Sequence, residues 1–377
     1  MMKVLHLLDT LGRGGAETIA LDVCRNAARF GLELTFVTTQ GGPLEEEFRK
    51  SGAEFIRLHR RLPIDLGVVF GLRRIIKERG IQITQGYQPV EGLHLYLATK
   101  GLPVKRVLSF QGGMRPSWKN MQAARFLIPR MDANIAVSRG ILNYHRKIDK
   151  LDTAKNFHVI YNGTDPERIK PTGHSLKKEL CLSEDTSLIG MVGNFYRDPR
   201  KDQLTVCRAL PKVFAEFENL HCIFAGKPEL GAEYKLQECI DLCRAEGIAA
   251  RVHFLGARAD IPDVLAALDL FVFSSLHEGL PLAVTEAMLA GVPLIVSGIE
   301  PLLEVSDNGN AAEVFPVGDA GALAEKILKL LKNDRLREGM RKSALDFARE
   351  NFSIDAHLSK LKKLYEDLQV SEADDRV

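Results

Sequence analysis

The chain has 377 residues, of which 45% are apolar and 27% charged; this is the composition of a globular protein that is too long for one hydrophobic core. We therefore expect two domains with a cleft between them. The net charge of +2 excludes a strongly basic or acidic protein, and six cysteines without a CxxC pair exclude a disulfide framework, so a reducing, cytoplasmic location is expected.

In the first half of the chain, short apolar runs alternate with longer amphipathic segments such as residues 16–30. The runs predict strands at residues 4–8, 34–39, 55–58, 81–85, 107–110, 133–137 and 159–160. This alternation is typical of a doubly wound parallel α/β sheet. We place the first Rossmann-like domain at residues 1–165. The turn-forming residues from Asn162 to about His174 then make an interdomain linker.

The same alternation resumes after the linker and predicts a second Rossmann-like domain at residues 175–352. Its strands are expected at residues 188–192, 221–225, 252–255, 270–274, 294–296 and 313–315. Residues 280–299 look superficially like a membrane span, but prolines, a glutamate and a glycine interrupt them, so no transmembrane segment is expected. A charged helix at about residues 353–370 is expected to cross back and brace the first domain.

The charge is divided unequally between the two halves. Residues 1–165 carry 25 Lys and Arg against 15 Asp and Glu, whereas residues 166–377 carry 26 against 34. The basic half is expected to face an acidic partner, and its richest stretch, residues 49–79, fits either an anionic membrane surface or solvated helix faces. Nucleic acid is not an expected partner, because the sequence has no zinc-finger spacing or recognition-helix pattern.

The segment from Ser274 to Leu282 follows a buried strand and opens a helix that has a proline near its start. Free amides and the positive end of the helix dipole make such a junction an anion site. Glu286 falls within an otherwise apolar stretch of that helix and must find a hydrogen-bond donor or face water. Ribose hydroxyls are suitable donors, and a capped loop or a solvated face is the alternative.

The run from Glu278 to Glu286 resembles the E-x7-E motif of the retaining glycosyltransferases of family 4, whose fold is GT-B. The resemblance extends over nearly the whole chain, in the segments 14–17, 136–138, 159–163, 193–201, 224–226, 254–256 and 286–293. It implies two Rossmann-like domains that face a cleft and a nucleoside-diphosphate sugar as the donor substrate.

The resemblance also implies roles for single residues of the second domain. Glu278 would lie near the transferred sugar, and Lys201 would pair with the donor diphosphate as leaving-group charge develops. Glu286 would bind the ribose. The backbone along the sugar and diphosphate would come from Gly279, Leu280, Pro281 and Leu282.

Two regions of the second domain depart from the family or match it more loosely. The arginine that the family has just after the glycine of the 193–201 segment is Asn194 in this chain, and either Arg197 or Arg200 would replace it. The region that contacts the nucleotide base in the family is matched by Phe254 and Arg258, and a loop of the same pocket by Gly226 and Lys227.

In the first domain, Gly14 and Gly15 follow a strand and open a helix, so their amides could reach the donor phosphates. A dinucleotide-binding fingerprint is the rival interpretation, but Glu17 stands where its third glycine belongs. Many relatives have a histidine that contacts the donor sugar where this chain has Gln111, which can hydrogen-bond but cannot act as a base. His277 is a weaker candidate for contact with the sugar or acceptor.

These observations predict a metal-independent, retaining glycosyltransferase without a cofactor, in which Glu278 and Lys201 are catalytic. It would move a hexose or hexose derivative to a saccharide or lipid-linked acceptor, in envelope polysaccharide or glycolipid synthesis, at the inner face of the membrane. No metal is expected, because no Asp-x-Asp motif follows a strand. The alternatives are a nucleotide-sugar 2-epimerase and a non-catalytic nucleotide-sugar-binding protein.

Overall fold

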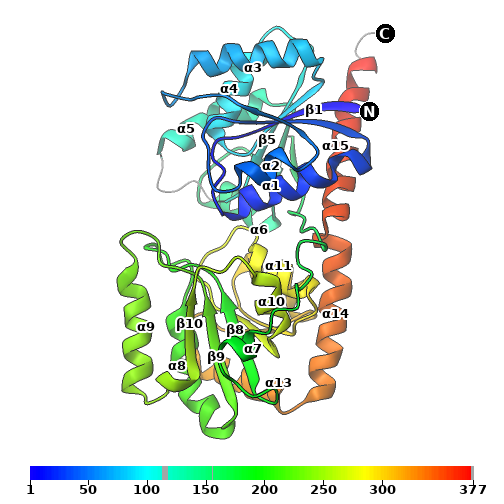
Figure 1. Cartoon of the computed structure of the whole chain (residues 1–377). Coiled ribbons are helices and arrows are strands. Elements are labelled where there is room, and N and C mark those ends of the chain that lie inside the picture. Colours follow the sequence, from blue (N-terminus) through cyan, green and yellow to red (C-terminus); the bar gives the residue numbers. More distant parts are fainter. Residues whose placement is uncertain (113–117, 155, 375–377) are drawn as a thin grey trace. The chain divides into compact units, whose positions relative to one another are not determined.

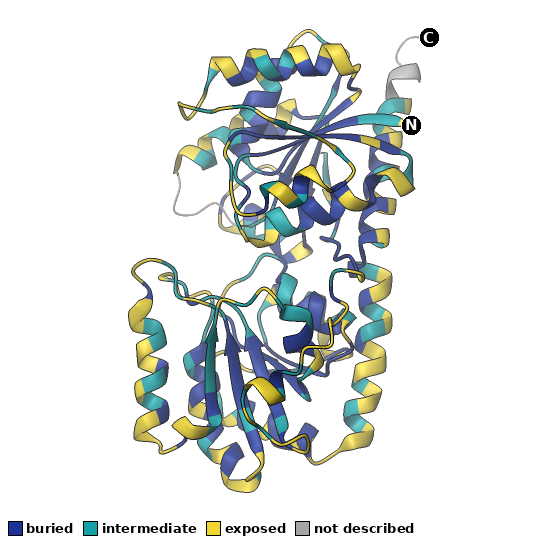
Figure 2. Ribbon diagram, in the orientation of Figure 1, coloured by how far each residue is buried: buried dark blue, intermediate teal, exposed yellow. Residues whose placement is uncertain are grey.

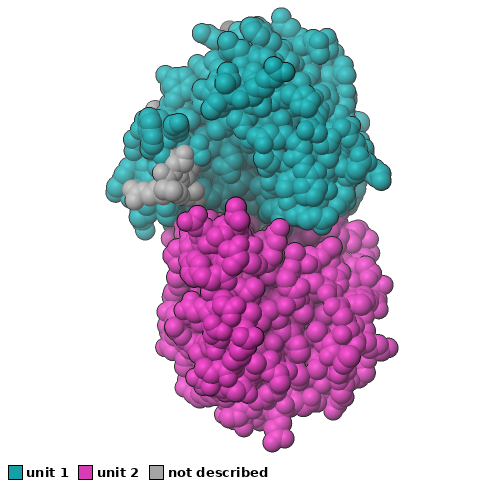
Figure 3. Space-filling model, turned by 60° about the vertical axis from the view of Figure 1, so that its left-hand side comes forward, with its two compact units in different colours: residues 1–164, 351–377 teal, residues 165–350 magenta. Residues whose placement is uncertain are grey.

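The computed structural model describes residues 1–112, 118–154 and 156–374, and Figure 1 shows its helices and strands. The chain divides into two compact units, which Figure 3 colours separately. Unit 1 contains residues 1–164 and 351–377, and unit 2 contains residues 165–350. The chain therefore starts in unit 1, builds all of unit 2, and returns to unit 1.

Unit 1 is built on a seven-stranded sheet in which every neighbouring pair of strands is parallel. Its strands are β1 (Met2–Leu8), β2 (Leu32–Thr38), β3 (Glu54–Arg57), β4 (Ile83–Gly86), β5 (Lys105–Phe110), β6 (Ala133–Ala136) and β7 (Phe157–Val159). The strand order is β3-β2-β1-β4-β5-β6-β7, so the direction in which successive strands are added reverses between β1 and β4.

Helices cover both faces of the unit 1 sheet, because apolar residues on adjacent strand positions point to opposite faces. Val4 packs in one core with Ala20 of α1 and Leu361 of α15, whereas Leu5 packs in another core with Leu72 of α3. The helices of this unit are α1 (Gly15–Asn26), α2 (Glu45–Arg49), α3 (Leu66–Arg79), α4 (Pro89–Thr99), α5 (Trp118–Leu127), α6 (Arg139–Lys147) and α15 (Ile354–Asp374), with short 3-10 helices at Ala27–Phe30 and Ile128–Arg130.

Buried hydrogen bonds attach α15 to the centre of the unit 1 sheet. The Tyr365 hydroxyl donates to Gln85 Oε1 at 2.6 Å and lies 2.9 Å from His6 Nε2, and Tyr87 Oη lies 3.1 Å from His6 Nδ1. Burial lowers the pKa of His6 to about 3, so the imidazole is neutral near pH 7. A neutral ring that donates from Nε2 to Tyr365 and accepts at Nδ1 from Tyr87 satisfies every one of these contacts.

The returning chain enters unit 1 beside the end of its first segment. Thr164 N–H donates to Phe352 O at 2.9 Å, and Ile354 N–H donates to Thr164 O at 2.9 Å. Gly163 lies against this crossing so closely that an added Cβ would stand 2.6 Å from His357 Cβ and 2.8 Å from Ile354 Cα. A glycine is therefore required here by close approach and not by backbone torsion.

Unit 2 has a six-stranded sheet in the order β10-β9-β8-β11-β12-β13, again with parallel neighbours. Its strands are β8 (Ser187–Val192), β9 (Leu220–Ala225), β10 (Val252–Gly256), β11 (Leu270–Phe273), β12 (Leu294–Ser297) and β13 (Glu313–Phe315). Its helices are α7 (Leu176–Glu179), α8 (Gln203–Glu216), α9 (Glu233–Ala245), α10 (Ile261–Ala266), α11 (Leu282–Leu289), α12 (Glu300–Val305), α13 (Ala320–Leu331) and most of α14 (Asp334–Phe352), with 3-10 turns at Ala249–Arg251 and Asp307–Gly309.

The prediction of two doubly wound parallel-sheet domains is confirmed, and the fold is GT-B. Each of the thirteen strands found in the described part of the chain lies within two residues of its expected start and end. The helix expected at about 353–370 is α15, which continues to Asp374. Figure 2 shows that the central strands of both sheets are buried, whereas α3, α9 and α14 carry exposed residues along their outer faces. Within the described residues, no helix combines the length and the apolar character that crossing a membrane requires.

Candidate functional site

The loop between β11 and α11, residues 274–281, carries the Glu278 part of the expected site. It is fixed to the end of β12 by Ser297, whose Oγ accepts from Ser275 N–H at 2.9 Å and donates to Ser275 O at 2.7 Å. The expected strand and helix thus flank this loop, and α11 starts at Leu282, immediately after Pro281.

The loop between β8 and α8 runs beside it, because β8 and β11 are neighbours in the sheet. Leu276 N–H donates to Arg200 O at 2.7 Å, and Asp202 N–H donates to Ser274 O at 3.0 Å. The two loops therefore form one surface at the carboxyl ends of the strands, which is where open α/β sheets bind ligands.

Lys201 and Glu278 meet on this surface. Lys201 Nζ lies 2.6 Å from Glu278 Oε1, and their side chains are only 10% and 9% exposed. The ammonium also stands 4.1 Å from the centroid of the Phe273 ring. Burial lowers the pKa of Lys201 and Glu278 opposes that shift, so the two charges stabilise each other in a place where neither is well solvated.

Ser275 is a member of this constellation that sequence reasoning missed. Its Oγ lies 2.6 Å from Glu278 Oε1, and it also hydrogen-bonds to Arg200 O. The carboxylate of Glu278 is thus oriented by Lys201 and by Ser275 together. The only available signal was a pair of serines directly after a buried strand, which by itself indicates little.

Glu286 lies on the buried face of α11, and its partner is Arg168. Arg168 Nη1 lies 2.6 Å from Glu286 Oε1. Burial raises the pKa of Glu286, whereas the charge and the hydrogen bond of Arg168 lower it. The carboxylate of Glu286, which lies in an otherwise apolar stretch, therefore accepts a hydrogen bond from within the protein. Sequence reasoning missed Arg168, which precedes Glu286 by 118 residues.

The two arginines that could replace the missing one at Asn194 differ in what they contact. Arg200 makes a bidentate pair with Asp198, with Nε–Oδ1 at 2.8 Å and Nη2–Oδ2 at 2.5 Å, and it lies over the Tyr196 ring. The guanidinium of Arg197, by contrast, makes no hydrogen bond or ion pair to any residue that the structure describes. Of the two, Arg197 keeps its charge uncompensated.

Asn194 itself has a local role in the loops. Its Oδ1 accepts from Lys227 N–H at 3.0 Å, so the amide ties the loop after β9 to the loop after β8. Gly226 is required there, because an added Cβ would stand 2.1 Å from Gly193 O. The side chain of Lys227, whose own backbone amide makes the bond to Asn194, is exposed at the same edge of the sheet.

The residues expected near the nucleotide base already have protein partners. The Phe254 ring stacks on Phe224 at 5.1 Å between centroids, as a core residue would. Arg258 pairs with Glu179 at 2.6 Å and with Asp260 at 2.6 Å, which holds the pKa of Glu179 down at about 2. The expected base contact by Arg258 would require these ion pairs to open.

Glu179 and Asp260, together with His174, also form the one group of metal-ligating side chains found among the described residues. The guanidinium of Arg258 already pairs with both carboxylates of this group. We therefore interpret it as an ion-pair cluster.

The backbone segment Gly279–Leu282 lies between Glu278 and α11, as the sequence order requires, and Leu280 and Pro281 are buried. His277 is exposed, and its carbonyl oxygen lies 3.3 Å from Ser275 Oγ.

In unit 1, Gly14 is the N-cap of α1 and Gly15 is its first residue. The space around Gly15 is open, but an added Cβ at Gly14 would stand 2.5 Å from Glu17 Oε2. Glu17 folds back onto this loop and accepts from Thr10 Oγ1 at 2.9 Å. A carboxylate thus lies at the helix start where a phosphate was expected, and a phosphate could bind there only if Glu17 turned away.

Gln111 follows β5, and its Oε1 accepts from Asn162 Nδ2 at 3.0 Å. This bond ties the loop after β5 to the segment that precedes the unit boundary. The neighbouring residues 113–117 lie outside the described part of the chain.

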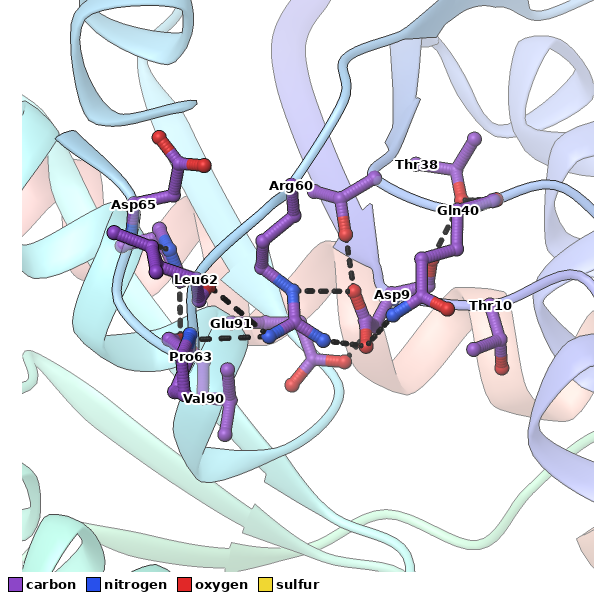
Figure 4. A network of polar contacts seen from close by, with 12 residues as sticks. Asp9, Thr10, Thr38, Gln40, Arg60, Leu62, Pro63, Asp65, Val90 and Glu91 are labelled. Carbon is purple, nitrogen blue, oxygen red and sulfur yellow. Dashed lines mark hydrogen bonds and ion pairs between the residues drawn. The ribbon is translucent and has the colours of Figure 1, made fainter. Parts of the chain in front are cut away.

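A second polar cluster, which sequence reasoning missed, joins the carboxyl ends of β1, β2, β3 and β4 in unit 1 (Figure 4). Asp9, directly after β1, accepts from Arg60 Nε at 2.9 Å and from Gln40 Nε2 at 3.1 Å, and also from Thr39. Asp9 N–H in turn donates to Glu91 Oε1 at 3.1 Å. Four loops are thereby held together at the point where the strand order reverses.

Ion pairs neutralise much of the basic stretch at residues 49–79. Arg57 pairs with Glu45, Arg60 with Asp9, and Arg79 with Glu54. The same stretch contains a run of strongly exposed large apolar side chains, which lie just before α3 and in its first two turns: Leu62 at 62%, Ile64 at 48%, Leu66 at 62% and Phe70 at 68% exposure.

Two family models match the chain. The model described as glycosyl transferases group 1 matches residues 186–333, within unit 2, and the model described as glycosyltransferase family 4 matches residues 13–168, most of unit 1. The two matches together cover every strand of the two sheets except β1.

Similar proteins are found among characterised sequences. The N-acetyl-alpha-D-glucosaminyl L-malate synthase of Bacillus anthracis is 26% identical over 373 residues, with 94% of each chain covered. The UDP-Gal:alpha-D-GlcNAc-diphosphoundecaprenol alpha-1,3-galactosyltransferase of Escherichia coli is 29% identical over 386 residues, with 98% of each chain covered.

Solved structures share the fold. Anabaena HepE in complex with UDP superposes with a TM-score of 0.84 at 20% identity, covering 97% of this chain and 100% of that one. A glycosyltransferase from Rickettsia africae superposes with a TM-score of 0.83 at 17% identity, covering 98% of each chain.

Proposed function

This chain belongs to the family 4 glycosyltransferases, and from that premise we propose that it transfers a hexose or hexose derivative from a nucleoside-diphosphate sugar to a saccharide or lipid-linked acceptor, with retention of configuration. The observation that carries the proposal is the buried Lys201–Glu278 pair at the carboxyl ends of β8 and β11. Relatives whose names include a lipid-diphosphate sugar acceptor support envelope glycan synthesis as the setting.

In the proposed reaction, Lys201 exchanges its partner. Without donor, Glu278 neutralises its ammonium. A donor diphosphate that enters this edge of the sheet offers Lys201 more negative charge than a single carboxylate does, so the ammonium moves to the phosphates and stabilises the charge that develops as the glycosidic bond breaks. Glu278, still held by Ser275, is then free to contact the sugar.

Arg197 is the residue that we propose for the second phosphate contact, because its guanidinium is uncompensated while that of Arg200 is bound to Asp198. No side chain is assigned as the base that takes the acceptor proton, since Gln111 cannot act as one. The absence of an assigned base is consistent with a retaining transfer in which the leaving phosphate takes this proton.

The test of this function begins with thermal-shift screening of UDP-, GDP- and ADP-hexoses, because a true donor stabilises the folded state by mass action. Release of the nucleoside diphosphate in the presence of saccharide and lipid-linked acceptors then gives turnover, and NMR of the product gives the anomeric configuration. We expect Glu278→Gln and Lys201→Met each to lower turnover by about 100-fold or more.

The matched control is Lys212→Met. It breaks an exposed Lys–Glu pair of the same unit, with Glu325 at 3.2 Å, near the C-terminal end of α8 and so away from the loop that precedes this helix. Its turnover should equal that of the unaltered protein. Normal turnover in Glu278→Gln, or inversion of configuration in the product, would refute the assigned roles.

We further propose that the exposed apolar run Leu62–Phe70 and the basic residues around it bind an anionic membrane surface, which is where a lipid-linked acceptor resides. Apolar side chains that enter the headgroup region, combined with Lys and Arg attracted to anionic lipid, are the features of an interfacial segment. Within the basic stretch, Arg61 and Lys77 make no side-chain ion pair to a described residue.

A further inference from the structure

The proposed function leaves the contact between Arg168 and Glu286 without a role. Arg168 comes from the linker predicted by sequence, and within unit 2 it reaches α11 to place Nη1 2.6 Å from Glu286 Oε1. An ion pair between two largely buried side chains is costly to form unless its geometry is good. Its presence beside the expected ribose-binding carboxylate therefore calls for an explanation.

The turn that carries Arg168 is itself held in place. Asp165 is buried, its Oδ1 accepts from Glu167 N–H at 2.9 Å, and its backbone carbonyl accepts from Arg168 N–H at 3.0 Å. The backbone of Arg168 thus has a fixed starting point before the side chain extends to Glu286. A long side chain anchored in this way loses less freedom when it forms an ion pair.

Glu286 needs such a partner if it is to accept hydrogen bonds from a ligand. Burial alone favours the protonated acid, which offers one oxygen fewer as an acceptor, and Arg168 counters this by stabilising the carboxylate. Arg168 contacts Oε1, and a carboxylate has acceptor capacity on both oxygens. The second oxygen is therefore left to accept from another donor.

We infer that Arg168 is a positioning residue for the donor: it holds one oxygen of Glu286 so that the other is presented, as a carboxylate, to the ribose hydroxyls. This inference rests on the proposed function, because it requires that a nucleotide binds at this edge of unit 2. It assigns to the segment after Asp165 a part in nucleotide selectivity.

The experiment compares each ribonucleotide with its deoxy forms. Dissociation constants are measured by calorimetry for UDP, GDP and ADP, and, for whichever binds, for the 2′-deoxy and 3′-deoxy forms. A hydrogen bond to a carboxylate makes the ribonucleotide bind the unaltered protein about 10–100-fold more tightly than the deoxy form that lacks the contacted hydroxyl. This ratio does not depend on the fraction of protein that is folded.

In Arg168→Ala we expect that ratio to fall to within about threefold of unity, through weaker binding of the ribonucleotide and not of the deoxy form. Glu286→Gln should behave in the same way, and the double variant should be no worse than Glu286→Gln alone. Arg168→Lys keeps the charge and should restore part of the ratio. Arg244→Ala, which removes an exposed arginine paired with Asp241 in the same unit, should keep the full ratio.

Failure of this inference and failure of the proposed function give different results. If Arg168→Ala weakens ribonucleotide and deoxynucleotide equally, the ion pair is only structural and the inference is overturned, while the proposed function stands. If the unaltered protein binds none of the three diphosphates, the proposed donor class fails and the inference falls with it.

Discussion

The surroundings of single residues at the carboxyl ends of the strands shift the pKa values of their side chains. Glu91 is the clearest case. It lies in the first turn of α4, it is buried, and its Oε2 has no hydrogen-bond partner within the described residues. Burial, together with the neighbouring Asp9 carboxylate, raises the pKa of Glu91 to about 7, although Arg60 opposes the shift. Glu91 therefore takes up and releases a proton near neutral pH.

The pH dependence of stability follows from that shift. The unfolded chain ionises Glu91 near its ordinary value of 4.5, whereas the folded chain does so only near 7, so the folded state binds more protons between these values. The contribution of Glu91 to the free energy of unfolding is therefore fully present below pH 4.5. It decreases as the pH rises through 7, by up to about 3 kcal/mol. We expect Glu91→Gln to remove that loss.

The measurement is the melting temperature of both proteins from pH 4.5 to 7.5. The difference, Glu91→Gln minus unaltered protein, should increase with pH over this interval and then level off. A difference that stays constant across the interval would show that Glu91 titrates at its ordinary value.

At the scale of elements, the attachment of α15 to unit 1 depends on contacts that its amphipathic pattern does not reveal. Tyr365 reaches His6 and Gln85 in the sheet, and the start of the helix pairs with Thr164. Gly163 allows the two chain segments to approach this closely. A side chain at that position must push the segments apart.

Gly163→Ala should therefore destabilise unit 1 by about 1–3 kcal/mol, since the new methyl group meets backbone and Cβ atoms that cannot move aside. Gly339→Ala in α14 is the matched control: the space around Gly339 is open and the position is helical, so stability should stay equal or rise. Chemical denaturation of both variants gives the comparison. Equal denaturation midpoints for the two variants would contradict the close approach of the two chain segments at Gly163.

At the scale of the whole molecule, the charge asymmetry follows the two units. Unit 1 carries 29 Lys and Arg against 20 Asp and Glu, net +9, and unit 2 carries 22 against 29, net −7. A protein with such a distribution is attracted to an anionic surface through one unit and repelled from it through the other. Attraction of this kind weakens as salt is added.

Flotation with liposomes measures this. We expect recovery with vesicles of anionic phospholipid at low salt, a marked drop at about 0.5 M salt because the attraction is screened, and little recovery with neutral vesicles. Leu66→Ser with Phe70→Ser should lower the recovery, because these side chains are the apolar part of the proposed surface. As the matched control, Leu230→Ser removes an apolar side chain of unit 2 that is 92% exposed, and it should leave recovery unchanged. Equal recovery with neutral and anionic vesicles would refute the proposed attraction between the basic residues and anionic lipid.

The sequence by itself determined the strands and the fold class of this protein. Apolar runs with flanking turn residues located the thirteen strands of the described residues, most reliably the central ones, because a strand buried on both faces must be apolar along its length. It also placed Lys201 and Glu278 at the ends of separate strands, and parallel strands bring such residues to one edge of the sheet.

Only the tertiary structure decided which charges are already paired. Arg258 is held by Glu179 and Asp260, Glu17 occupies the helix start beside Gly14, and Arg168 reaches Glu286 from the linker. Local periodicity reports whether a residue is buried or exposed, and it carries no information about a partner more than a hundred positions away. The strand pattern is a property of neighbouring residues, whereas the Arg168–Glu286 contact exists only once the sheet has brought distant loops together.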